Sequence, residues 1–148
     1  MSHLLLLILS VIVGIMVVVQ GGLNARLGVL ISNSMLATSS ALLTSASLTV
    51  LVAIITVRHF PSMAEVKEVP AYLWFTGGIL SFIAVTLFYY IIPRVGISTA
   101  VTFGLAGQIC FAAIAGHYGW FGLPVEPVSI KKLIGMLVLV AGVILIKY

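Results

Sequence analysis

The sequence predicts an all-α integral membrane protein with five transmembrane helices and a short interfacial helix. Hydrophobic residues make up 62% of the chain and charged residues only 7%, whereas soluble domains carry roughly a quarter of charged residues. The mean hydropathy is +1.33. Five long apolar runs have no Asp, Glu, Lys or Arg at their centres. With so little polar chain between them, we expect a single transmembrane domain over 1–148.

The first two apolar runs predict helices over about 4–30 and 34–57. The first run has no basic leader and no convincing small-residue cleavage site, so we interpret it as a helix and not as a signal peptide. Ser32 and Asn33 predict a short turn between the two helices, where Asn33 or Ser34 can cap the second.

The most polar stretch, 58–70, predicts a loop on the membrane surface. Ser62 and Glu65 have the spacing of a capping box, in which two side chains satisfy each other's backbone amides at the start of a helix. This spacing predicts the short interfacial helix. Pro70 then suits the first turn of the next transmembrane helix.

The other three apolar runs predict helices over about 71–92, 97–118 and 130–147. Pro93 and Gly96 are expected to end the third helix, and the short connection makes the third and fourth helices antiparallel neighbours. The fifth run is the shortest. It crosses a hydrocarbon core of roughly 30 Å only if its flanking lysines snorkel or the membrane thins.

The charged residues exclude several functions. All three acids lie between the apolar runs, so the bundle lacks the membrane carboxylate that commonly binds cations or couples to protons. The seven Lys and Arg lie at the ends of runs, where they snorkel to lipid, and no nucleic acid partner is predicted. Cys110 is the only cysteine, which excludes a Cys-based metal cage. No enzyme motif, metal site or cofactor is predicted.

The basic residues are distributed almost evenly between the two membrane faces. With five spans, four of them lie on the face of the N-terminus and three on the other, namely Arg58, Lys67, Lys131 and Lys132 against Arg26, Arg94 and Lys147. Because such residues set orientation, a difference of one gives the chain little preference for either topology. The alternative is that one residue suffices for a fixed orientation.

Five polar residues inside the runs are candidates for binding a substrate. Gln20 and Asn24 are four residues apart and share a helix face, and Gln108 offers a third amide. Tyr89 and Tyr90 offer hydroxyls and ring faces, although neighbours about 100° apart predict that only one faces a cavity. The alternative for the amides is interhelical hydrogen bonding.

Small and basic residues carry further expectations. Gly135 and Gly142 lie seven residues apart on the fifth helix and permit close approach of another helix. Arg26 and Arg94 stand at helix ends, where we interpret them as anchors, with contact to an anionic ligand as the alternative.

The motifs of the chain resemble known membrane transporters. Residues 91–100, IIPRVGISTA, are similar to the helix-turn-helix of the small multidrug resistance proteins and the wider drug/metabolite transporter superfamily. A closer resemblance is to the short five-helix bacterial inner-membrane branch catalogued as a domain of unknown function. It rests on QGGLNARLG at 20–28, AGQ at 106–108 and HYG at 117–119, and it covers essentially the whole chain.

This resemblance implies a carrier of small molecules in the bacterial cytoplasmic membrane. It implies half of a ten-helix bundle, completed by a second copy in antiparallel orientation or by an oppositely oriented paralogue, with the glycines of the fifth helix at the dimer contact. The chain departs from the resemblance by lacking a membrane acid in its first helix and by having Gly116, where an acid often precedes His117. We therefore expect a neutral or anionic substrate, or an apolar cation. A non-transporting membrane subunit is the alternative.

Overall fold

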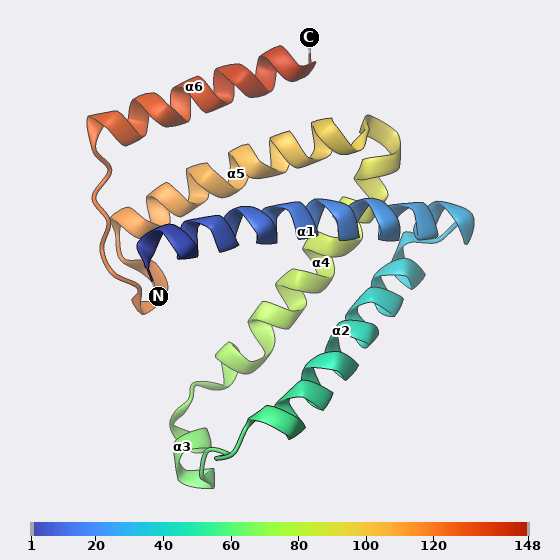
Figure 1. Cartoon of the computed structure of the whole chain (residues 1–148), viewed down its shortest axis with the longest axis vertical. Coiled ribbons are helices and arrows are strands. Elements are labelled where there is room, and N and C mark those ends of the chain that lie inside the picture. Colours follow the sequence, from blue (N-terminus) through green and yellow to red (C-terminus); the bar gives the residue numbers. More distant parts are fainter. Residues whose placement is uncertain (1, 148) are drawn as a thin grey trace. The chain divides into compact units, whose positions relative to one another are not determined.

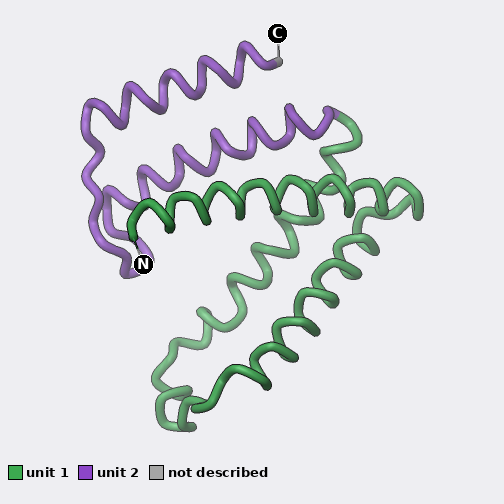
Figure 2. Tube along the Cα trace, viewed as in Figure 1, with its two compact units in different colours: residues 1–94 green, residues 95–148 purple. Residues whose placement is uncertain are grey.

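The computed structural model describes residues 2–147. Its helices are α1 (His3–Leu30), α2 (Ser34–Thr56), α3 (Met63–Glu68), α4 (Ala71–Val95), α5 (Ile97–His117), the 3-10 turn η1 (Trp120–Gly122) and α6 (Ile130–Lys147) (Figure 1). No strand occurs within these described residues. The chain forms two compact units, the first ending at Arg94 and the second beginning at Val95 (Figure 2).

Four helices are long and apolar enough to cross a membrane, namely α1, α2, α4 and α5. Their large apolar side chains point outward, with Leu4 and Ile54 each 67% exposed, as suits a protein whose solvent is lipid. The 18-residue α6 contains three lysines and is not among these four candidates. A fifth span through α6 therefore stays a prediction, as does the interfacial position of α3.

The turn between α1 and α2 is fixed by Asn33. Its side-chain oxygen accepts hydrogen bonds from the backbone amides of Met35 at 2.9 Å and Leu36 at 3.1 Å. These amides have no partner inside the helix, so the cap stabilises the start of α2. Of the two cap candidates, Asn33 takes this role and Ser34 becomes the first residue of the helix.

The predicted end of the third transmembrane helix is wrong by about one turn. The helix α4 continues through Pro93 as far as Val95, and Gly96, with a φ of 86°, ends it. Pro93 has no amide hydrogen to donate to the carbonyl of Tyr89, so the helix continues for two more residues without that bond. The side chain of Arg94 also folds back along this turn and donates to the carbonyl of Tyr90 at 2.6 Å.

Close packing in the first unit is concentrated where α1 meets α2 and α4. A Cβ added to Gly28 would lie 3.3 Å from the backbone Cα of Ser34, and one added to Gly21 would lie 3.1 Å from the ring of Phe88. The buried residues of this unit gather around these two contacts and are Gly21, Ala25, Gly28, Ala37, Thr38, Tyr89 and Ile92. Small residues therefore let the backbones of α1 and α2 approach each other, whereas α4 meets α1 through side chains such as that of Phe88.

In the second unit, α5 and α6 lie side by side and are joined by a tethered loop (Figure 1). The Glu126 amide donates to the Gly116 carbonyl at 2.8 Å, and the Val128 amide donates to Nδ1 of His117 at 3.2 Å. Lys132 and Glu126 form an ion pair at 3.1 Å. These bonds hold the loop against the end of α5, and His117 has a structural role in them.

The capping box expected at α3 is present. The backbone amide and the hydroxyl of Ser62 both donate to the carboxylate of Glu65, at 2.7 and 2.8 Å. Together these bonds lower the pKa of the Glu65 carboxyl below its ordinary value of 4.5, because they favour the charged form. The amide of Glu65 donates in return to the Ser62 hydroxyl.

We expect α3 to open at acidic pH. Since the pKa of Glu65 is lower in the folded chain than in the unfolded one, its stabilising contribution is present above the unfolded value and is lost as the pH falls through the folded value. Amide hydrogen exchange over 63–68, corrected for intrinsic rates, measures this opening. Glu65→Ala removes the acceptor of both bonds and should open α3 at neutral pH, whereas Glu68→Ala serves as the control, and equal protection in both variants would contradict the expectation.

Candidate functional site

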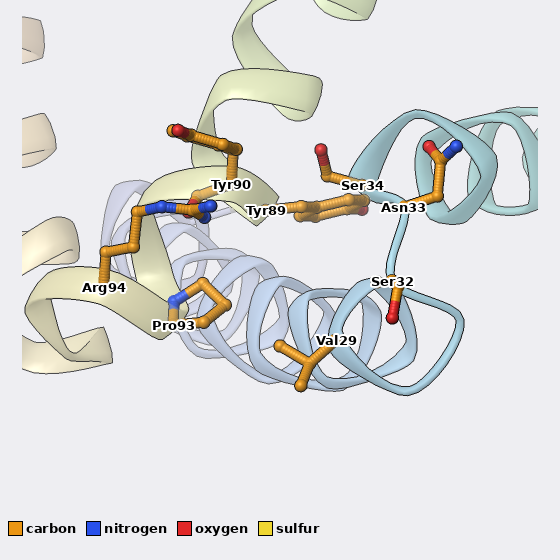
Figure 3. Close-up of a pocket in the computed structure, with 9 residues that line it drawn as sticks. Val29, Ser32, Asn33, Ser34, Tyr89, Tyr90, Pro93 and Arg94 are labelled. Atoms are coloured by element: carbon orange, nitrogen blue, oxygen red, sulfur yellow. The ribbon is translucent and has the colours of Figure 1, made fainter.

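A pocket of about 340 Å³ lies in the first unit, where the end of α1, the start of α2 and the end of α4 meet (Figure 3). Pockets of roughly 300 to 1,000 Å³ are typical of small-molecule sites. The residues that line it are Gly28, Val29, Ser32, Asn33, Ser34, Tyr89, Tyr90, Pro93 and Arg94. Most of them are polar or aromatic, which is unusual in a chain that is 62% hydrophobic.

Tyr89 forms the inner wall of the pocket. It is only 3% exposed, and its hydroxyl group interacts with the side chain of Asn24 of α1. The amide nitrogen of Asn24 also donates to the backbone carbonyl of Gln20 at 2.9 Å. The bond to Gln20 orients the Asn24 side chain, so that Tyr89 interacts with an oriented group of a second helix.

Arg94 and Tyr90 form the opposite side of the pocket. The guanidinium carbon lies 3.4 Å from the centre of the Tyr90 ring, in a cation–π contact. Figure 3 shows the guanidinium between Tyr90 and Pro93, directed toward Tyr89. Its Nη1 atom donates to the Tyr90 carbonyl. Among the described residues Arg94 forms no ion pair, so its charge is not neutralised by a carboxylate of this unit.

The comparison with known families identifies the kind of protein that carries this pocket. A family model described as "Putative inner membrane exporter, YdcZ" matches residues 5–145. The chain belongs to the DMT_YdcZ family. No curated protein and no solved structure matches it. The match confirms the resemblance to the short branch of the drug/metabolite transporter superfamily. Together, the family and the four candidate spans show that this YdcZ-family chain is a multi-pass inner-membrane protein.

Several residues singled out in the YdcZ-family sequence meet at the pocket. Tyr89 and Tyr90 both line it, although their separation around the helix predicts that only one would. Tyr89 reaches inward between the helices, while the ring of Tyr90 lies under Arg94. Asn24 does not line the pocket, but its side chain interacts with the hydroxyl group of Tyr89. Gln20 is exposed on α1 and contributes only its backbone carbonyl.

The remaining candidates of the YdcZ-family chain lie in the second unit. Gln108 is exposed on α5. A Cβ added to Gly135 or Gly142 would meet nothing within 4 Å, so their faces are not used for packing within the described chain. Gly135 also lines a cavity of about 410 Å³, which has Glu126 and Lys132 among its lining residues. Within the described residues no cluster of His, Cys, Asp and Glu could hold a metal ion.

The sequence did not single out Ser32, Asn33 and Ser34 as pocket residues, and it assigned Arg94 to anchoring. The sequence nevertheless contains a pattern that points to these residues. The three polar residues of the turn are four to six places after Gly28, and Arg94 stands at the end of a helix that starts on the opposite face. Two such ends on one membrane face can meet, but periodicity alone does not say which helices are neighbours.

Proposed function

We propose that this chain carries a small molecule across the inner membrane by alternating access, as one half of an antiparallel dimer. The observation that carries the transport function is the match of an exporter family over residues 5–145. Alternating access needs a site that opens to each side in turn, and carriers commonly build it between two repeats of opposite topology. One short chain supplies one such repeat, so a second, inverted copy completes the pair.

The near-even distribution of basic residues supports the inverted pairing. Counted with α6 as the fifth span, a bias of a single residue between the two faces lets copies of the chain insert in either orientation. The space beside Gly135 and Gly142 supports a contact through α6, because no atom of the described chain lies within 4 Å of a Cβ added at either position, and the space at Gly135 is the cavity that α5 and α6 line. An oppositely oriented paralogue would use the same surfaces.

The pocket of the first unit supports a substrate site on each copy. Tyr89 and Tyr90 supply the aromatic wall of the pocket, and the side chain of Asn24 interacts with Tyr89. Gln20 and Gln108 remain exposed on their helices, so their amides are available to a ligand or to the second copy. We assign all five residues to substrate binding. Energy coupling through a membrane carboxylate is not part of the proposal, since no acid lies inside the spans.

The proposal predicts that transport requires both orientations. One variant, Met63→Lys with Val69→Lys, adds two charges to the loop face, and another, Leu30→Lys with Val95→Lys, adds two to the opposite face, so each fixes one topology. All four positions are exposed. Everted vesicles are incubated with a cytosolic metabolite extract, and the accumulated solutes are measured by mass spectrometry. We expect accumulation with the unaltered chain, none with either variant alone, and recovery on co-expression.

Two results would contradict parts of this proposal separately. If no solute accumulates beyond vesicles that lack the chain, although both tagged termini show that it is inserted, the transport function fails. If one variant alone accumulates as much solute as the unaltered chain, transport stands and the antiparallel pairing fails. If a single variant accumulates solute only in cells that contain an oppositely oriented paralogue, the active pair is instead the heterodimer with that paralogue.

A further inference from the structure

We infer that the pocket of the first unit is a binding site for a phosphate group, with Arg94 as its principal ligand. The assignment of this bound molecule as the transported substrate rests on the proposed function, whereas the binding itself does not. Arg94 has a conformation suited to binding an anion, no carboxylate of the first unit competes for its guanidinium, and serine hydroxyl groups line the same pocket.

Arg94 is held in a conformation suited to binding an anion. Its guanidinium lies 3.4 Å from the ring centre of Tyr90, and one of its five N–H groups donates to the Tyr90 carbonyl. One face and one donor are thereby used to fix the group, and four donors remain. An arginine that only anchors a helix extends its stem toward the headgroups. Here the stem is folded back so that the guanidinium lines the pocket.

No acidic residue of the first unit competes for this guanidinium. The acids of the unit, Glu65 and Glu68, lie in α3, beyond the other end of α4. The helix between them and Tyr90 is about 30 Å long, well beyond the distance at which exposed charges interact strongly. The pocket is therefore positively charged. The first free amides of α2 do not add to this, because Asn33 already accepts from them.

Hydroxyl groups supply further donors from other directions. Ser32 and Ser34 line the pocket, and in the part of the chain that the structure describes neither hydroxyl takes part in a side-chain hydrogen bond. A phosphate presents several oxygens in a tetrahedral arrangement and so matches a forked guanidinium plus separate hydroxyls better than a planar group does. A volume of about 340 Å³ leaves room for more of the ligand than the phosphate alone.

Two kinds of molecule carry such a phosphate to this place. The pocket lies at the ends of three helices, where a lipid headgroup could reach it, and it would equally accept the phosphate of a soluble molecule. The chemistry of recognition is the same in both cases. The experiment below separates them.

The first arm uses the purified, delipidated full chain in an uncharged detergent. Inorganic phosphate is titrated at constant ionic strength, and binding is measured from the broadening of its phosphorus NMR line. We expect Arg94→Gln to weaken binding about tenfold or more, because it removes the charge and the fork. Arg26→Gln makes the same change of charge at an exposed arginine outside the pocket and should alter binding less than about twofold.

The second arm extracts the chain from membranes that contain phosphatidylglycerol and counts retained lipids by native mass spectrometry. Arg94-dependent binding of phosphate supports a soluble ligand, and Arg94-dependent retention of the lipid without phosphate binding supports a headgroup. Binding of neither probe, or an equal loss in Arg26→Gln, would overturn the inference. If Arg94→Gln does not fold, Arg94→Lys is measured instead, and wild-type affinity in that variant also counts against it. Loss of solute accumulation with intact phosphate binding would refute transport alone.

Discussion

Gly28→Leu should destabilise the first unit by about 2 kcal/mol or more, since side chains forced into a filled contact cost on that order. The added Cβ would lie 3.3 Å from the Cα of Ser34 and 3.5 Å from the Cβ of Ala37. Backbone atoms cannot move aside as a flexible side chain can, so α1 and α2 must separate. The free energy of unfolding in mixed micelles, measured by denaturing-detergent titration, gives the size of the effect.

Gly14→Leu is the matched control, because it makes the same substitution in the same helix. A Cβ at Gly14 meets nothing within 4 Å, so its leucine would enter lipid and leave the stability of the chain almost unchanged. Equal destabilisation by both substitutions would mean that the loss of a helical glycine matters and the contact between α1 and α2 does not.

Tyr89→Ala should cost about 3 kcal/mol, which is typical of removing a buried aromatic side chain. Tyr89 is 3% exposed between α1, α2 and α4, and its removal would leave a void beside the pocket. Tyr89→Phe keeps the ring and removes only the hydroxyl group with its interaction with Asn24, so it should cost no more than about 0.6 kcal/mol, the value typical of hydrogen bonds inside membranes. The same denaturing-detergent titration measures both variants.

Tyr72→Ala provides the comparison for this pair. Tyr72 lies in the first turn of α4 and is 63% exposed, so the same truncation removes no interhelical packing. If Tyr72→Ala were as destabilising as Tyr89→Ala, the lost stability would come from removing any aromatic side chain of α4 and not from the packing of Tyr89 at the pocket.

Much of the helical pattern can be read from the sequence because lipid imposes a strong requirement on it. An apolar run must satisfy its own backbone hydrogen bonds, so run length predicts a helix directly. The cap at Asn33 and the capping box at Ser62 follow from local chemistry and are present. The end of α4 was predicted three residues too early because one missing hydrogen bond at Pro93 does not by itself end a helix, and the chain leaves the helix only at Gly96, with its positive φ.

The pocket could be predicted only in part, for a physical reason. Tyr89 and Tyr90 were recognised as polar aromatic residues inside a span, and both line it. The role of Arg94 depends on whether its stem extends to the headgroups or folds back, and both conformations fit the same sequence. Asn24 was recognised as an amide in lipid, but its partner lies 65 residues away on another helix. Such pairings come from tertiary packing and not from spacing.

The exposed first half of α1 has a consequence for sequence drift. Every side chain from Leu4 to Val17 is exposed, and the packed contacts of the helix begin only at Gly21. Within one chain these side chains pack against no other helix, so any apolar residue suits these positions, because only a favourable transfer of the side chain into hydrocarbon is required. Leu, Ile and Val can therefore replace one another there freely over evolutionary time, whereas the buried positions Gly21, Ala25 and Gly28 of the same helix tolerate little exchange.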